Sequence, residues 1–351
     1  MPQVTTPDPI SRMPDARAVA LAQWLSMVAP PVAAIAPASA DASFRRYFRV
    51  TLAAPWREAA GAMTLIAMDA PPPNEDCRPY VHVARLMRDG GINVPRIEAA
   101  NVADGYLLMS DLGRTTYASV LGEDNAAHLY ADALDTLVLM QRMRCEDDLP
   151  PYDDALLRRE LALFPDWYVA RHLQRTLDAA ERASLERIFD VLVANNLAQP
   201  RVFVHRDYHS RNLMVTAPNP GVLDFQDAVH GPITYDLVSL LRDAYVEWSE
   251  GQELDWAIRY WERARKAGLP VSTDFAAFWR DFEWMGVQRQ LKVLGIFARL
   301  KHRDGKAGYT DDMPRVMRYL RRAAGRYRDL EPLLALLDAL ENRAPGYVSL
   351  S

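Results

Sequence analysis

The pattern of hydrophobic and polar positions changes character about a third of the way along the chain. Before Asn125, short apolar runs rich in β-branched and aromatic residues predict strands, and two amphipathic segments predict helices. From Asn125 onward, helical periodicity dominates, interrupted by only three short strand-like runs. This order predicts an α+β fold with a small β-rich lobe, residues 1–110, and a larger helical lobe, residues 111–351.

The first lobe is expected to begin with a helix from Asp15 to about Val28, followed by a loop. A second helix is predicted over Cys77–Gly91, where the Gly90-Gly91 pair stops it. Strands are predicted over Ser43–Leu52, Met63–Ala70 and Tyr106–Gly113. The apolar segment 18–40 could instead be a signal peptide. However, Asp8 and Asp15 deprive its flank of net positive charge, and Pro30-Pro31 interrupts it.

The amino-acid composition of the chain limits the classes of partner that it is expected to bind. Half of the 351 residues are hydrophobic, the net charge is −5, and the isoelectric point is near 5.9. An acidic chain disfavours nucleic acid as the partner, and the absence of an eighteen-residue apolar run disfavours a membrane span. The two distant cysteines, Cys77 and Cys145, fit a reduced compartment and argue against structural zinc, so we expect a cytoplasmic protein.

Candidate chemistry lies in two short stretches. The run "VHRDYHSRNLMV" carries Asp207 and Asn212, and "DFQD" follows with Asp224. A turn-rich segment joins two short strands here, so the hairpin is expected to aim Asn212 and Asp224 at one point. One amide oxygen and one carboxylate suit Mg²⁺, which completes its shell with water and phosphate oxygens. Asp207 would then accept a proton from a substrate hydroxyl, unless these polar residues are only turn and cap residues.

The sequence His205-Arg206-Asp207…Asn212, with Asp224-Phe225-Gln226-Asp227, resembles the catalytic pattern of protein-kinase-like phosphotransferases. No activation segment closed by Ala-Pro-Glu follows; the chain continues almost directly into a helix that contains Asp236, which could anchor the catalytic loop. The pattern therefore resembles the aminoglycoside/choline phosphotransferase superfamily, which implies a protein-kinase-like bilobal fold. It also implies ATP and Mg²⁺ as cofactors and a small alcohol as substrate.

The nucleotide side departs from that family. Protein kinases hold the phosphates with a strand lysine paired to a helix glutamate, yet the first 265 residues contain no lysine. Arginine could supply the charge from "SFRRYFR", where the resemblance points to Ser43 and Arg46 as nucleotide contacts and alternation groups Arg45 with Arg49. These arginines could also be solvated strand residues. The stretch "LLMSDLG" resembles the hinge that binds adenine through its backbone, which implies positions Met109, Ser110 and Leu112.

Longer stretches, including "AMDAPPPNEDCRPY" and "LDFQDAVHGPITYDLVSLLRDAY", resemble the anomeric sugar kinases of cell-wall recycling over about residues 39–320. That resemblance implies phosphorylation of the C1 hydroxyl of N-acetylmuramate and N-acetylglucosamine to the sugar 1-phosphate in peptidoglycan recycling. Arg289 and Lys292 fall on one helical stripe that tolerates a lactyl carboxylate, although they could equally form ordinary salt bridges. Glu160 and Trp167 are further candidates for sugar contacts, by hydroxyl acceptance and by ring stacking.

The expected mechanism is direct in-line transfer, with Asp207 as proton acceptor, His205 and Arg206 in the catalytic set beside it, and Mg²⁺ on Asn212 and Asp224. The expected partners are the amino sugar and ATP, with no nucleic acid and no membrane, and we expect a monomer. Three alternatives remain: a kinase of the same fold for choline, ethanolamine or an aminoglycoside, a nucleotide-binding pseudokinase with a regulatory role, and a protein kinase. The missing lysine favours the pseudokinase, whereas the intact Asp-Asn-Asp set disfavours it.

Overall fold

The computed structural model describes residues 15–40, 44–57 and 59–341. The chain divides into two compact units: residues 1–114 with 216–226, and residues 115–215 with 227–351. The sequence places the join near Ser110 to Arg114. The segment 216–226 groups with the first unit, so Asp224 belongs with the strands rather than with the helical lobe to which the sequence pattern assigned it.

The first unit is built on a five-stranded antiparallel sheet in the order β1-β2-β3-β5-β4. Its strands are β1 (Val32–Ala40), β2 (Arg46–Trp56), β3 (Ala62–Asp69), β4 (Ile97–Asn101) and β5 (Tyr106–Ser110). The three strands expected from the sequence are confirmed. The loop expected after Val28 is wrong, because β1 occupies it. This alanine-rich strand has little β-propensity of its own and is held by pairing with β2.

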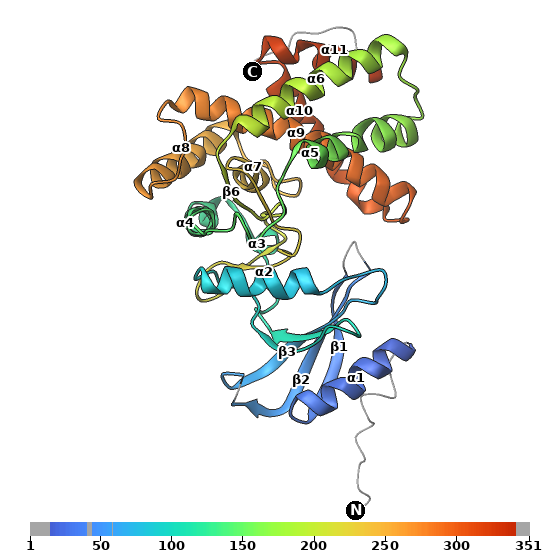
Figure 1. Cartoon of the computed structure of the whole chain (residues 1–351), viewed down its shortest axis with the longest axis vertical. Helices are drawn as coiled ribbons and strands as arrows, with labels where there is room; N and C mark the ends of the chain where they lie inside the picture. The colour runs from blue at the N-terminus through green and yellow to red at the C-terminus, as the bar shows by residue number, and fades with distance from the viewer. Residues whose placement is uncertain (1–14, 41–43, 58, 342–351) are drawn as a thin grey trace, which may run out of the picture. The chain divides into compact units, whose positions relative to one another are not determined.

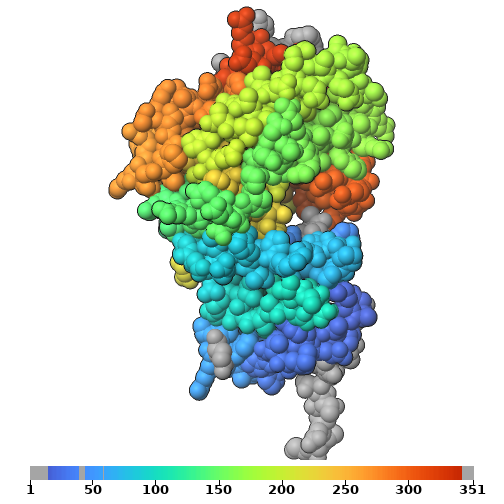
Figure 2. All heavy atoms as spheres, viewed as in Figure 1, coloured from blue at the N-terminus to red at the C-terminus, as the bar shows by residue number. Residues whose placement is uncertain are grey.

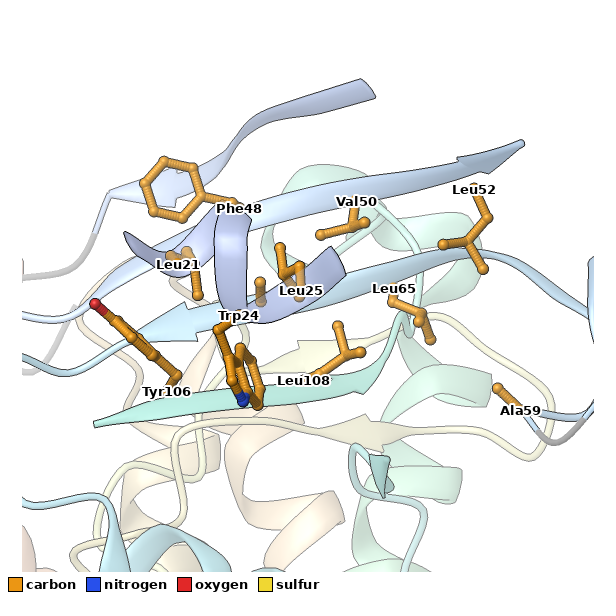
Figure 3. Packing of buried hydrophobic residues seen from close by; sticks show 11 residues of the cluster. Leu21, Trp24, Leu25, Phe48, Val50, Leu52, Ala59, Leu65, Tyr106 and Leu108 are labelled. Carbon is orange, nitrogen blue, oxygen red and sulfur yellow. The ribbon is translucent and has the colours of Figure 1, made fainter. Parts of the chain in front are cut away.

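Two helices cover opposite faces of this sheet: α1 (Ala16–Val28) and α2 (Arg78–Asp89). Asp15 caps α1 by accepting from the N–H of Ala18. Leu21, Trp24 and Leu25 of α1 pack against alternate residues of the strands, including Tyr106 and Leu108 of β5 (Figure 3). From α2, the hydroxyl of Tyr80 donates to Met109 Sδ, so the other face of β5 is covered by α2 (Figure 1).

The second unit is mainly helical. Its helices are α3 (Tyr117–Val120), α4 (Glu123–Gln141), α5 (Asp154–Leu161), the π-helix η2 (Phe164–His172), α6 (Ala179–Ala198), α7 (Tyr235–Leu241), α8 (Glu250–Lys266), α9 (Phe275–His302), the short η3 (Ala307–Asp312), α10 (Met313–Ala324), η4 (Arg328–Leu330) and α11 (Glu331–Leu340). Their side chains fill the spaces between the ribbons in the space-filling view (Figure 2). No helix in the described residues is long and apolar enough to span a bilayer.

The long helix α9 is the axis of this unit, with η2, α10, α7 and α6 packed against it. At its buried start, the guanidinium of Arg242 lies between the carboxylates of Glu253 and Glu283, at 3.2 and 2.9 Å. All three side chains are fully buried, and the two ion pairs offset much of the cost of burying these charges. The network fixes α9, which contributes a wall to the pocket described below.

Candidate active site

The loop that carries Asp207 begins where a buried strand ends. The strand β6 (Arg201–Val204) pairs antiparallel with β9 (Val229–Pro232), and its last three residues are buried. The carboxylate of Asp236, at the start of α7, accepts the backbone N–H groups of His205 at 2.6 Å and Arg206 at 2.9 Å. The anchoring role expected for Asp236 is thus confirmed.

A second buried carboxylate, Asp243, accepts the N–H of Ser210 at 2.9 Å and holds the far end of the same loop. It follows Asp236 by seven residues and lies just beyond the end of α7 (Tyr235–Leu241), and no signal in the sequence identified it. Between the two anchors, Arg206 has a left-handed backbone with φ of 76°, a conformation that costs a non-glycine residue about 1–3 kcal/mol. The two carboxylates stabilise that conformation and so define where the next residue, Asp207, points.

Asp207 itself is bonded to the loop through its backbone. Its carbonyl accepts from the side-chain Nδ2 of Asn212 at 3.0 Å and from the N–H of His209 at 3.0 Å. Its N–H donates to His205 Nδ1 at 3.2 Å, and His205 is fully buried. His205 therefore lies beneath the loop and supports it, rather than reaching a substrate. The side-chain nitrogen of Asn212 binds the loop, so its amide oxygen is the atom suited to a cation.

The carboxylate of Asp207 lies among positive charges. Burial opposes its ionisation, but Lys292, His209, Arg206 and Arg289 outweigh burial and lower the pKa of Asp207 to about 2. Asp236, which anchors this loop, behaves in the opposite way. Burial raises the pKa of Asp236 to about 7, and the nearby charge of Asp207 adds to the rise. Asp207 is thus ionised at neutral pH and is an acceptor-only group for a hydroxyl proton.

A pocket of about 80 Å³ opens beside this carboxylate within the second unit. Its lining combines polar or charged side chains with apolar ones. The lining residues are Asp207, His209, Ala244, Tyr245, Arg289, Lys292, Val293, Ile296 and Phe297. The structure therefore brings together Asp207, Arg289 and Lys292 from the residues singled out in the sequence. The apolar wall was not predicted, although the α9 members recur at the helical spacing of one face.

Arg289 and Lys292 differ in how they are held. The Lys292 ammonium donates to Tyr235 Oη at 2.8 Å and pairs with Glu160 Oε1 at 3.1 Å. Arg289 is 4% exposed, and its buried Nη1 has no hydrogen-bond partner among the described residues. A buried donor without a partner is costly, so a ligand oxygen in the pocket would satisfy it.

Two residues expected to contact a sugar lie elsewhere. Glu160 is buried on α5, with both carboxylate oxygens occupied by Tyr152, Arg206 and Lys292. Trp167 is half-buried on η2. Neither residue lines the pocket. Sequence spacing could not reveal this, because it locates the helix of each side chain but not the partners that occupy it.

Three neighbouring arginines of the first unit have different partners: Arg45, just before β2, and Arg46 and Arg49 within it. Arg46 Nε bonds Asp69 at 3.0 Å, and the same guanidinium also pairs with Asp15. Arg49 is bidentate to Asp111, at 2.6 and 2.9 Å. Arg46 is therefore tied to β3 and to the residue that caps α1 by ion pairs, and the nucleotide contact expected from the resemblance stays a prediction. Ser43, the other expected contact on this segment, lies outside the described residues.

Arg45 occupies a different environment. Its guanidinium lies 3.7 Å from Asp224 Oδ1 and 4.0 Å from Glu75 Oε2, and its side chain is 12% exposed. Glu75, just before α2, also accepts the N–H of Phe44 at 3.1 Å. The first unit thus contains an ion pair between Arg45 and Glu75, just before the start of α2. The spacing of these residues in the sequence did not predict this pair.

Asp224 follows β8 (Gly221–Val222), with a left-handed φ of 64° and a partly exposed side chain. Its Oδ1 accepts from Gln226 Nε2 at 2.9 Å. The next residue, Phe225, is fully buried against Tyr80 of α2, with ring centroids 4.7 Å apart. The buried aromatic ring fixes the segment while the carboxylate reaches the surface of the unit.

The three hinge positions lie at the end of β5. Met109 is buried and pairs with Ile66 of β3, and Ser110 donates its N–H to Arg96 O at 2.8 Å while its Oγ accepts from Arg96 N. Leu112 is half-buried just beyond the strand. The side chains of Met109 and Ser110 make contacts within the first unit, so any role in nucleotide binding at this segment would fall to its backbone groups.

Comparisons with known proteins agree with this geometry. The model of the phosphotransferase enzyme family matches residues 34–269. An N-acetylmuramate/N-acetylglucosamine kinase from Pseudomonas aeruginosa is 51% identical over 341 residues, covering 94% of this chain and 98% of the relative. A kinase of the same name from Neisseria meningitidis is 47% identical, covering 92% of this chain and 96% of the relative.

Solved structures show the same fold at low sequence identity. Choline kinase LicA from Streptococcus pneumoniae matches with a TM-score of 0.62 at 10% identity, covering 87% of this chain and 99% of that one. The ADP-bound aminoglycoside phosphotransferase APH(2'')-Ib matches with a TM-score of 0.56 at 13% identity, covering 85% and 96%. The protein-kinase-like α+β fold expected from the sequence is confirmed, and the chain belongs to the phosphotransferase enzyme family.

Proposed function

We propose that this protein is an ATP-dependent kinase that phosphorylates the C1 hydroxyl of N-acetylmuramate and N-acetylglucosamine in cytoplasmic peptidoglycan recycling. The names of relatives at about 50% identity support the amino sugars as substrates. The observation that carries the proposal is the pocket in which the ionised Asp207 faces Arg289 and Lys292. The position of the phosphate on the sugar is the part of the proposal that goes furthest beyond those names.

The charge of the pocket supports a neutral or anionic acceptor. Arg289 and Lys292 line it, together with the aromatic rings of Tyr245 and Phe297. A polycationic aminoglycoside or a quaternary ammonium would meet two like charges there. An N-acetyl sugar has neutral oxygens for the guanidinium and an apolar ring face for the aromatic rings, and N-acetylmuramate adds a carboxylate.

In this proposal Asp207 accepts the proton of the acceptor hydroxyl at a carboxylate oxygen. A pKa of about 2 makes Asp207 a weak base, so proton transfer belongs late in the reaction, when the new O–P bond has acidified the hydroxyl. An anomeric hydroxyl is more acidic than an ordinary alcohol, which suits a weak base. Most of the rate enhancement then comes from positioning and from charge neutralisation by the surrounding cations.

Asn212 and Asp224 are the residues proposed to hold Mg²⁺. The donor set fits, because the Asn212 nitrogen binds the loop, its amide oxygen is a hard donor, and Asp224 presents a partly exposed carboxylate. When bound with ATP, Mg²⁺ neutralises charge on the phosphate oxygens. Arg45, rather than Arg46 or Arg49, is proposed as the nucleotide-binding cation of the first unit, with Glu75 as its orienting carboxylate. Backbone groups at Met109, Ser110 and Leu112 are proposed to bind adenine.

A panel of acceptors tests this function. ADP formation is measured with N-acetylmuramate, N-acetylglucosamine, glucose, choline and kanamycin, each at several concentrations. We expect kcat/KM for the two amino sugars to exceed that for choline and kanamycin by at least about 100-fold. Preference for choline or kanamycin would overturn the assignment. Absence of acceptor-dependent ADP formation across the panel would favour the pseudokinase alternative.

A further inference from the structure

Glu160 is a buried carboxylate that receives two cations and a phenol. It lies on α5, with a side chain 5% exposed. Its Oε1 accepts from both Arg206 Nη2 and Lys292 Nζ, the latter at 3.1 Å, and its Oε2 accepts from Tyr152 Oη. An ionised carboxylate removed from water requires such compensation, and here it is nearly complete.

The two cations that bind Glu160 also act on Asp207. Lys292 lines the Asp207 pocket, and Arg206 directly precedes Asp207 in the loop. Lys292, Arg206 and Arg289 are the permanently charged groups that lower the pKa of the Asp207 carboxyl. Glu160 therefore supplies a second negative charge, besides Asp207, that acts on both Arg206 and Lys292. Without it, both cations would be drawn toward Asp207 alone.

We propose that Glu160 is a positioning residue for phosphoryl transfer, whose buried carboxylate holds Arg206 and Lys292 beside Asp207 at the distance the reaction needs. The inference rests on the proposed kinase function. Arg206 is further fixed by a 3.3 Å bond from its Nη1 to the Asp227 carbonyl and by the Tyr152 ring, whose centroid lies 5.9 Å from its guanidinium carbon. Lys292 is further fixed by Tyr235 Oη at 2.8 Å. Each cation is thus locked from two sides, with Glu160 common to both.

The ion pair between Arg206 and Glu160 takes the place of a contact that is regulated in protein kinases. In protein kinases, arginines near the catalytic machinery pair with phosphate groups on an activation segment, and this pairing orders the site. No Ala-Pro-Glu follows Asp227 here, and the chain enters α7 at Tyr235. The Glu160 carboxylate provides the anion for Arg206 from within the fold, so the site is ordered without a modification.

The decisive variant is Glu160→Gln, which keeps the shape and removes the charge. We expect kcat to fall by about 10- to 100-fold while the KM for ATP changes by less than about 3-fold, because the lost interaction acts at the acceptor side. Burial alone would lower the pKa of Lys292, and Glu160 reverses this and raises it. The alkaline limb of the kcat/KM profile, where Lys292 loses its proton, should therefore move to lower pH in the variant.

Three further variants distinguish a positioning role of Glu160 from a role in folding alone. Glu160→Asp should restore part of kcat and move the alkaline limb back toward wild type, because it returns the charge. Lys292→Met should remove the sensitivity to Glu160, so that the double variant is no slower than the slower single variant. The exposed Glu186→Gln on α6 is the matched control and should behave as wild type.

All variants are assayed on the acceptor that the wild-type protein phosphorylates best, and their fold is checked by near-UV circular dichroism. If Glu160→Gln is folded and keeps the wild-type kcat and alkaline limb, the inference is overturned while the kinase assignment stands. Equal loss in Glu160→Asp and Glu160→Gln, with unchanged pH profiles, also overturns it. If Glu160→Gln does not fold, additivity of Lys292→Met and Glu160→Asp would overturn it instead. Absence of any wild-type turnover overturns the kinase function itself.

Discussion

The carboxylate of Asp236 lies 2.9 Å from the backbone nitrogen of Arg206 and accepts its hydrogen bond. Arg206 has a left-handed backbone conformation, and Asp207 follows it immediately. The buried side chain of Asp236, on α7, therefore helps to set the direction of the Asp207 carboxylate. The same logic recurs with Asp243 at the other end of the loop. Positioning in this site is thus achieved by buried carboxylates rather than by the exposed face of the pocket.

Asp236→Asn tests the energetic role of this anchor through pH. Burial raises the pKa of Asp236 from 3.8 to about 7, so the folded protein binds this proton more tightly than the unfolded chain does. The stabilisation is fully present below about pH 4 and is lost as pH rises through about 7. Chemical denaturation should show wild-type stability falling across that window by roughly 1–4 kcal/mol relative to Asp236→Asn. Parallel curves for the two proteins would contradict this role of Asp236.

Asp207→Asn tests the proton acceptor. The amide keeps the shape of the side chain but cannot accept the hydroxyl proton, so kcat should fall by about 10²–10⁴-fold. Because the pocket of Asp207 is the proposed acceptor side, the Kd for the Mg-nucleotide should stay within about 3-fold of wild type. Steady-state kinetics and calorimetric titration measure these two quantities. A mild effect on kcat would remove Asp207 from the proposed role.

Asp224→Ala should have the opposite signature. Removal of one of the two proposed oxygen donors for Mg²⁺ should weaken binding of Mg-ATP by at least about 10-fold. Titration with ATP in the presence of EDTA supplies the control, since metal-free binding should change little. If the variant and wild type bind Mg-ATP equally, Asp224 has a different function.

Arg45→Ala is compared with Arg46→Ala, its immediate neighbour. Loss of a charge-assisted contact to phosphate of about 1.5–3 kcal/mol predicts a Kd for ATP that is about 10- to 100-fold weaker in Arg45→Ala. Arg46→Ala breaks ion pairs with Asp15 and Asp69 and should lower the Tm with little change in nucleotide affinity. Nucleotide titration and thermal unfolding of both variants distinguish the two arginines. A weaker Kd for Arg46→Ala alone would reverse the assignment.

Arg289→Ala probes acceptor selectivity. The buried Nη1 of Arg289 has no hydrogen-bond partner in the described part of the chain, and the residue lines the pocket together with Asp207 and Lys292. Removing it should raise the KM for N-acetylmuramate by about 10-fold or more, and that for N-acetylglucosamine by less, because only the former carries a carboxylate. Arg299→Ala, on the same helix but outside the pocket, is the matched control. Equal effects on both sugars would place Arg289 on a group they share.

The strands and helices with strong patterns were predictable from the sequence, and β1 was not. Five of its nine residues are alanine, which carries little strand propensity, and only pairing with β2 specifies the strand. The assignment of 216–226 to the first unit was also beyond sequence reasoning, because chain order places that segment among the helices. Tertiary pairing decided both cases.

In the site, Asp207, Arg289 and Lys292 could be predicted because a motif and a helical stripe carry information about spacing. The ion pairs of Arg46 and Glu160 could not be predicted. Both are charged residues whose partners, Asp69 for Arg46 and Tyr152 for Glu160, come from other segments and occupy them. A single sequence shows a charge but not its counterion, and the counterion decides whether the residue faces a ligand.

The identity of the reaction product tests the proposed phosphoryl transfer most directly. Phosphorus NMR of the product formed from ATP and N-acetylmuramate locates the new phosphate through its coupling to the sugar protons. We predict one new phosphate signal coupled to the anomeric proton, formed by the wild-type protein and absent with Asp207→Asn. A phosphate coupled to the protons at C6 instead, or a product signal that persists at the wild-type rate in Asp207→Asn, would contradict the proposed reaction.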